Sequence, residues 1–164
     1  MLLAGCGLSQ DVSVGGSSGG PPRGSTAPQL TGTLVDGGSF DLAAERGKPV
    51  VVDFFASWCG PCVAQQADIS ATARKYAGRV TFVGVDDRET AAAARGFLRS
   101  YTVPYEAIVD ADGHIYGDYS IAGPPTTVVV DGAGRVVAGY LGGVRQDTLG
   151  AQLDSLLGSA TASS

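Results

Sequence analysis

Two apolar segments in the first half of the chain predict two buried strands. Residues 50–56 and 80–85 are apolar on both faces apart from Asp53 and Thr81, as expected for central strands covered on two sides. The residues between them, from Gly60 to about Ala77, favour a helix that Gly78 ends. The positions of this helix expected to face inward are Ala64, Ala67, Ile69 and Ala73. This strand–helix–strand order forms the expected centre of the fold.

Shorter patterns on either side complete this core. Residues 29–35 and 39–42 alternate around Asp36-Gly37-Gly38, which indicates a hairpin. The later segments predict a helix from Glu89 to about Tyr101 that Asp86 and Asp87 can cap, a strand at 106–109, a turn at 110–113, strands 126–131 and 135–141 forming a hairpin, and an amphipathic helix at 148–157. The order of these elements predicts an α/β sandwich with a mixed sheet.

The two ends of the chain differ in composition from this core. Residues 9–28 are rich in Gly, Ser and Pro, which is typical of a flexible tether. Leu3-Ala4-Gly5-Cys6 resembles the lipobox of bacterial lipoproteins, whose cysteine is lipidated; the alternative is an apolar start with an unrelated thiol. No basic segment precedes Cys6, so lipidation requires a longer precursor. We expect a lipobox remnant at 1–6, a tether at 7–27, one domain at 28–157 and a disordered tail at 158–164.

Composition and charge narrow the range of partners. The net charge is −5 and no cluster of Lys or Arg occurs, which argues against nucleic-acid binding. No segment approaches the length of a membrane-spanning helix, so membrane contact is expected only through a lipid on Cys6. A chain of 164 residues that is 44% apolar can fill one core. We expect a monomer.

The motif Trp58-Cys59-Gly60-Pro61-Cys62 lies where the first buried strand meets the predicted helix. Two cysteines at this spacing in a first helical turn bring their sulfurs within bonding distance, so they can form a redox-active disulfide. The helix N-terminus favours a thiolate at Cys59. A zinc site would need further ligands, but the chain has only one other cysteine and one histidine, both far away in sequence. Val63 follows Cys62, which excludes haem attachment, and no metal or cofactor is predicted.

Three motifs together resemble the thioredoxin fold. They are Val52-Asp53-Phe54, the cysteine motif and Gly123-Pro124-Pro125-Thr126-Thr127. More narrowly, residues 28–157 are similar to the extracytoplasmic thiol-disulfide oxidoreductases related to TlpA, ResA and the cytochrome c maturation thioredoxins. The resemblance implies a thioredoxin-like α/β/α sandwich with a central mixed sheet and an added N-terminal hairpin.

The resemblance also implies roles for individual residues. Cys59 would be the exposed nucleophile, and buried Cys62 would resolve the mixed disulfide. Asp53, a costly acid in an apolar run, would exchange the Cys62 proton; the alternative is a partly solvated strand residue. Trp58 would shield the dithiol and contact substrate, or only pack. Gly60 and Pro61 match thioredoxin and favour a reducing potential.

The proline loop and the first turns of the helix show both matches and departures. Pro125 matches the family's cis-proline, which faces the disulfide. Pro124 occupies the position whose backbone pairs with a substrate strand, yet it has no N–H to donate. The cytochrome-maturation branch places a Glu and a Pro where this chain has Gln65 and Ala67, which weakens that narrower resemblance. His114 is expected to be a surface residue in a loop and is assigned no role.

These features predict a thiol-disulfide oxidoreductase outside the cytoplasm, anchored to the bacterial membrane by Cys6 and acting as a reductant. Its expected partners are protein thiol or disulfide clients, with apocytochrome c as one class, and a membrane electron-donor protein. The alternatives are a disulfide-forming oxidase, a thiol peroxidase of the related redoxin family and a non-catalytic scaffold lipoprotein. The peroxidase is disfavoured because Phe55-Ala56-Ser57-Trp58 contains no proline before Cys59. The scaffold is disfavoured because Cys59, Cys62, Asp53 and Pro125 are all present.

Overall fold

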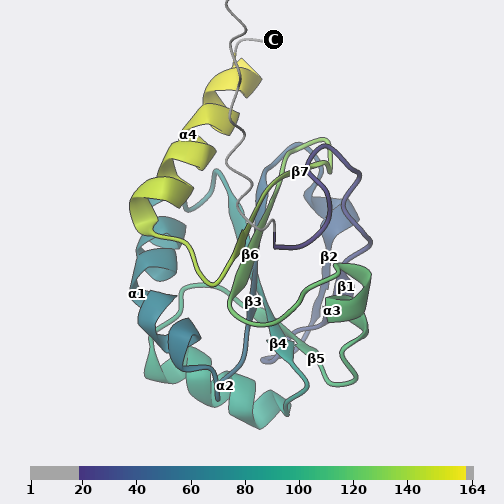
Figure 1. The fold of residues 1–164 in the computed structure, drawn as a ribbon, viewed down its shortest axis with the longest axis vertical. Coiled ribbons are helices and arrows are strands. Elements are labelled where there is room, and N and C mark those ends of the chain that lie inside the picture. The colour runs from purple at the N-terminus through teal and green to yellow at the C-terminus, as the bar shows by residue number, and fades with distance from the viewer. Residues whose placement is uncertain (1–18, 162–164) are drawn as a thin grey trace, which may run out of the picture.

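The computed structural model describes residues 19–161, which form three layers (Figure 1). A five-stranded mixed sheet of order β5-β4-β3-β6-β7 forms the middle layer. Its strands are β3 (Val50–Phe55), β4 (Thr81–Asp87), β5 (Ala107–Asp110), β6 (Thr126–Val130) and β7 (Val136–Leu141). The first three are parallel, and β6 is antiparallel to both β3 and β7. The predicted mixed α/β fold is confirmed.

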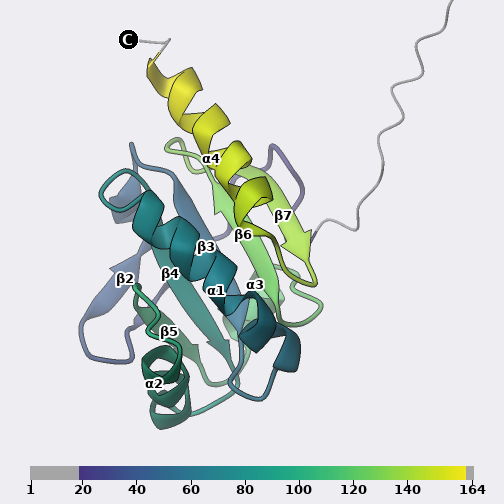
Figure 2. The same ribbon diagram turned by 90° about the vertical axis from the view of Figure 1, so that its left-hand side faces the viewer.

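Helices cover one face of this sheet (Figure 2). They are α1 (Gly60–Lys75), α2 (Ala91–Ser100) and α4 (Gln146–Thr161). The other face is covered by α3 (His114–Asp118), the 3-10 helix η1 (Leu42–Glu45) and the hairpin of β1 (Thr31–Thr33) and β2 (Ser39–Asp41). All six residues of β3 are buried because both faces are covered. The C-terminal ends of the parallel strands β3 and β4 lie at the same end of the sheet, and α1 begins there.

The inward face of α1 differs from the prediction. Ile69 and Ala73 are buried as expected, but Ala64 and Ala67 are exposed. Two glutamines, Gln65 and Gln66, occupy the buried positions instead, and each forms side-chain hydrogen bonds there. Hydrogen bonding makes the burial of these amides tolerable, so polarity alone does not identify the outer face of this helix.

The ordered region begins earlier than the composition predicts. Residues 19–27, placed in the tether, instead run beside the sheet: Gly24 donates its N–H to the Val136 carbonyl at 2.7 Å, and Ala27 donates to Gly134 at 2.9 Å. Thr26 forms a bridge with Arg135. This segment supplies hydrogen bonds to the start of edge strand β7, which explains why Gly-rich and Ser-rich residues are held in place. Cys6 and the rest of the predicted tether lie outside the described residues.

Three further boundaries are corrected. Asp86 and Asp87 belong to β4, and the side chain of Thr90 caps α2 in their place. α4 runs through Thr161, so the expected disorder is wrong for residues 158–161; no proline interrupts them, and Ser159 donates its hydroxyl to the Ser155 carbonyl one turn back. His114 does not lie in a loop but is the first residue of α3.

Candidate active site

The turn between β3 and α1 carries the two cysteines. Cys59 is the N-cap of α1, and a disulfide joins it to Cys62 with an S–S separation of 2.17 Å and a Cα–Cα separation of 5.2 Å. The Cys62 N–H also donates to the Cys59 Sγ at 3.1 Å. The Cys59 sulfur therefore lies at the positive end of the helix dipole. Once the disulfide is reduced, this position favours a thiolate at Cys59.

The exposure of the motif differs from the prediction in one respect. Cys59 is not exposed: in the disulfide form its exposed fraction is 4%, against 1% for Cys62. Both cysteines pack in an apolar cluster with side chains of α2, which leaves little surface on either sulfur. Trp58 is 65% exposed and so is available to a client, with Gly60 and Pro61 exposed nearby.

Asp53 lies on β3 and is 1% exposed, as a buried acid in an apolar strand is expected to be. Burial raises its pKa to about 6, while a hydrogen bond from Tyr105 opposes that rise. The Tyr105 hydroxyl donates to Oδ2 at 2.8 Å, and the Gln65 Nε2 donates to Oδ1 at 3.1 Å. With such a pKa, the carboxylate can accept a proton near neutral pH and return it.

Two donors to Asp53 are oriented by their own partners. The Val144 N–H donates to the Gln65 Oε1 at 3.0 Å, so the Gln65 amide must turn its NH₂ toward Asp53. Gln66 donates to the Tyr105 hydroxyl oxygen at 3.2 Å, which leaves the Tyr105 proton for Asp53. Burial and the charge of Asp53 raise the pKa of Tyr105 well above its usual range, so the hydroxyl stays a donor. The sequence did not identify Tyr105 or Gln66 as part of the site, and it showed Gln65 only as a departure from a family pattern.

The proline loop lies at the same end of the sheet. The Pro124–Pro125 peptide bond is cis, as the resemblance implies. Thr126 pairs with Phe54, so the antiparallel register holds Pro125 at the end of β3 from which the cysteine turn departs. The Pro125 carbonyl accepts from the Gly142 N–H at 2.9 Å, which ties the loop to the end of β7. Pro125 is buried and Pro124 is half-buried.

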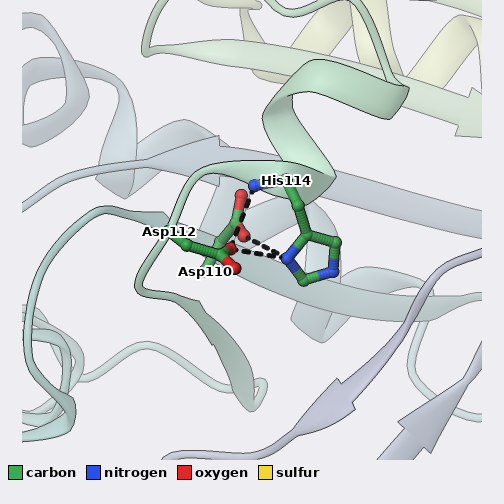
Figure 3. A group of neighbouring side chains, drawn as sticks. All are labelled: Asp110, Asp112 and His114. Atoms are coloured by element: carbon green, nitrogen blue, oxygen red, sulfur yellow. Dashed lines mark hydrogen bonds and ion pairs between the residues drawn. The ribbon is translucent and has the colours of Figure 1, made fainter.

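A second polar cluster surrounds His114 at the start of α3 (Figure 3). The His114 Nδ1 lies 2.7 Å from the Asp112 Oδ1 and 3.2 Å from the Asp110 Oδ1. The hydrogen bond with Asp112 raises the pKa of the exposed His114. Asp110 also accepts from the Tyr116 N–H at 3.0 Å. Within residues 19–161 this is the one group of three side chains close enough to share a metal ion; its hydrogen bonds to the backbone and between side chains fit a turn and helix start.

Comparison with known proteins agrees with this geometry. The chain is 34% identical to the thiol:disulfide interchange protein HelX of Rhodobacter capsulatus over 137 residues, 83% of this chain and 70% of HelX. It is 28% identical to the thiol-disulfide oxidoreductase ResA of Bacillus cereus over 81% of this chain and 78% of ResA. The structure of a secreted Mycobacterium tuberculosis disulfide oxidoreductase homologous to Escherichia coli DsbE superposes with a TM-score of 0.70 at 32% identity, covering 78% of this chain and 96% of that one.

The fold, the disulfide at the start of α1 and the cis-proline at the same end of the sheet define a thioredoxin-fold thiol-disulfide oxidoreductase. A family model described as Redoxin matches residues 22–156, and the chain belongs to that family. No helix in the described part of the chain is long and apolar enough to span a membrane.

Proposed function

We propose that this oxidoreductase reduces disulfides of protein clients outside the cytoplasm. The observation that carries the proposal is Asp53: a buried carboxyl with a pKa of about 6, held by two donors, on the strand that leads into the cysteine turn. Gly60 and Pro61, the thioredoxin choice between the cysteines, support the reductive direction.

The reaction begins with the reduced dithiol. The Cys59 thiolate attacks one sulfur of the client disulfide, forming a mixed disulfide and expelling the other client sulfur as a thiolate. Cys62 transfers its proton to Asp53 and attacks the Cys59 sulfur, which expels the second client thiolate. Two electrons pass from the dithiol to the client. The proton held by Asp53 and one proton from solvent, which replaces the one that Cys59 lost on ionising, convert the two client thiolates to thiols, and the Cys59–Cys62 disulfide seen here is the product. A second dithiol protein must then supply two electrons to restore the reduced state.

The proposal includes partners and a location. Apocytochrome c is a suitable client class because its haem-attachment thiols must be reduced, and a membrane electron-donor protein is a suitable reductant. The secreted location of the mycobacterial protein supports a site of action outside the cytoplasm, with Cys6 as the proposed lipid anchor. Retention of native protein in the membrane fraction after a salt wash, and its release by detergent, would test the anchor.

The redox potential of the Cys59–Cys62 couple decides the direction. Equilibration with a defined dithiol buffer should give a potential on the order of −270 mV, as in thioredoxin, whereas a value nearer −120 mV, as in DsbA, would reverse the direction to disulfide formation. Insulin reduction under dithiothreitol tests the catalytic class, because a scaffold protein would show no turnover. Consumption of peroxide by the reduced protein would instead support the peroxidase. The Redoxin match does not separate these activities, but both named relatives are oxidoreductases.

A further inference from the structure

A glutamate holds the turn that carries the active-site cysteines. Ser57 stands two residues before Cys59, and Glu89 lies between β4 and α2. The Ser57 N–H donates to the Glu89 Oε2 at 2.6 Å, and the Ser57 hydroxyl donates to Oε1 at 2.6 Å. Both carboxylate oxygens therefore bind one residue of the turn. Hydrogen bonds to an ionised acceptor are the stronger kind, so this contact ties the turn to the end of β4.

Asp86, whose side chain is within hydrogen-bonding reach of that of Glu89, is a further buried acid at this end of the sheet. It pairs with Phe55 in the register between β4 and β3, and its exposed fraction is 0%. Neither of its carboxyl oxygens accepts a hydrogen bond from any residue in the range 19–161. An ionised carboxylate in that position would be costly, because nothing replaces the water it has lost. A protonated Asp86, in contrast, can donate to Glu89.

The electrostatics of the pair agree with a proton on Asp86. Burial, together with the hydrogen bond and charge of Glu89 and the charge of Asp87, raises the pKa of Asp86 to about 8. Burial opposes ionisation of Glu89, but hydrogen bonds from Ser57 and Asp86 outweigh it and lower the pKa of Glu89. One carboxyl thus keeps the proton and the other keeps the negative charge, which is the arrangement expected of two acids that cannot both ionise.

We propose that Asp86 and Glu89 share one proton and that this carboxyl pair positions the turn bearing Trp58 and Cys59, loosening it when the proton is lost. Once the pair is doubly ionised, the two carboxylates repel each other, and Glu89 can no longer keep both bonds to Ser57. The link to client turnover rests on the proposed reductase function. Neither acid is assigned contact with the reacting sulfurs, so both are positioning residues.

Of the other charged and titratable groups around the pair, Asp87 adds to the repulsion. Asp87, the next residue on β4, is itself buried, and burial raises its pKa. The cation next to it in sequence, Arg88, pairs with Asp87 at 3.5 Å. On the opposite face, the Tyr116 hydroxyl donates to the Phe55 carbonyl at 3.1 Å, and burial raises the pKa of Tyr116 beyond the working range, so it remains neutral. Asp87 therefore adds a negative charge near Asp86, and the cation Arg88 pairs with Asp87 rather than with Asp86.

Trp58 offers a direct test, because it is the only tryptophan of the chain and follows Ser57. Its fluorescence should be titrated from pH 6 to pH 10 in the oxidised protein, where the thiols cannot ionise. We expect a transition near pH 8 in the wild type. Asp86→Asn should abolish it, because an amide NH₂ donates to Glu89 at every pH. Asp53→Asn and His114→Gln are the matched controls, and both should keep the transition.

A second variant protects the test against a fold defect. Glu89→Gln, at a half-buried position, removes the second charge and should also abolish the transition. Turnover in the insulin assay should fall about 2- to 10-fold more steeply from pH 7 to pH 9 in the wild type than in Asp86→Asn, the range that loss of one hydrogen bond gives. A transition that persists unchanged in Asp86→Asn, or in Glu89→Gln where only that variant folds, overturns the proposal. A transition lost as expected in a protein that reduces no insulin would instead uphold the carboxyl pair and refute the reductase function.

Discussion

Asp53 and Asp86 are buried to the same degree on neighbouring strands of one sheet, yet their surroundings differ. Asp53 accepts hydrogen bonds from Gln65 and Tyr105, and its pKa rises to about 6. Asp86 has no donor in the described structure and faces Glu89, and its pKa rises to about 8. Burial raises the pKa of both acids, and the neighbouring groups then decide how far.

The difference suits two different tasks. An acid that titrates near pH 6 can take up and release a proton during each catalytic cycle, which is what resolution by Cys62 requires. An acid that holds its proton through neutral pH can serve as a permanent hydrogen-bond donor, which suits a structural link. We expect the largest effect from loss of a cysteine and smaller effects from changes at Asp53, Gln65 and Pro124.

Loss of either cysteine tests which thiol attacks the client. Cys59→Ser should abolish turnover and trap no client, because only Cys59 lies at the helix N-cap. Cys62→Ser should accumulate mixed disulfides, since nothing resolves them. The trapped species can be counted on non-reducing gels after exposure to oxidised clients. Equal trapping by the two variants would contradict the assignment of Cys59 as the attacking thiol.

Asp53→Asn should remove the proton acceptor while keeping its shape. Resolution of the mixed disulfide should slow by about 100-fold, the lower end for general acid–base catalysis. The loss should be largest above pH 6, where the wild-type carboxyl is ionised. Stopped-flow rates across pH 5 to 8 provide the measurement. A pH–rate profile that the substitution leaves unchanged would refute the role of Asp53.

Asp53→Asn should slow resolution but increase the stability of the fold at neutral pH. The folded-state pKa of Asp53 lies above its unfolded value, so the stability it contributes is fully present below about pH 4 and lost as the pH rises through about 6. The variant has no such loss. Above pH 6 its free energy of unfolding should therefore exceed that of the wild type by up to about 3 kcal/mol, two pKa units at about 1.4 kcal/mol each. Urea denaturation at pH 4 and at pH 7.5 measures this difference.

Local patterns identified part of this site and missed the rest for a definite reason. Asp53 stands out because an acid interrupts an apolar strand, and Cys59 and Cys62 stand out through their spacing. Tyr105 and Glu89 acquire their roles from partners that lie 52 and 32 residues away in the chain. No periodicity encodes such contacts; they depend on how β3, β4 and α1 are placed against one another.

The fold is easier to predict from the sequence than these contacts are. Continuous apolar runs predicted β3 and β4, and glycine-rich turns predicted both hairpins, because these signals are local. The pattern of α1 predicts only part of its buried face, because Gln65 is buried through hydrogen bonds to Asp53 and Val144 that form only in the tertiary structure. The composition of residues 19–27 is that of a linker, so the sequence predicts no order there. Their order depends on hydrogen bonds to the edge of β7, which form only in the tertiary structure.

Gln65→Glu would make the surroundings of Asp53 similar to those of Asp86. The Val144 N–H would still bind one oxygen of the new side chain, so the other would face Asp53 in place of the NH₂ donor. Two adjacent carboxyls cannot both ionise easily, so the pKa of Asp53 should rise. The pH–rate profile for resolution should shift toward alkaline pH by about one unit, which lowers the ionised fraction of Asp53 at pH 6 from about one half to about one tenth and the rate by about 5-fold. Gln65→Met, which removes the donor without adding charge, should shift the profile less. Equal shifts in the two variants would contradict the charge argument.

Pro124→Thr should have the smallest effect, because it changes one hydrogen bond to a client and leaves both acids in place. In this fold the residue before the cis-proline pairs through its backbone with the substrate strand, and Pro124 can accept but not donate. Threonine would restore the N–H. A net hydrogen bond contributes about 0.5–1.5 kcal/mol, so trapped clients should bind about 2- to 10-fold more tightly. Client peptides that carry a serine in place of the reactive cysteine allow affinity to be measured without chemistry. Unchanged affinity, with the Pro125 peptide bond still cis and the pH profile of Asp53 unaltered, would show that the client strand does not pair with residue 124.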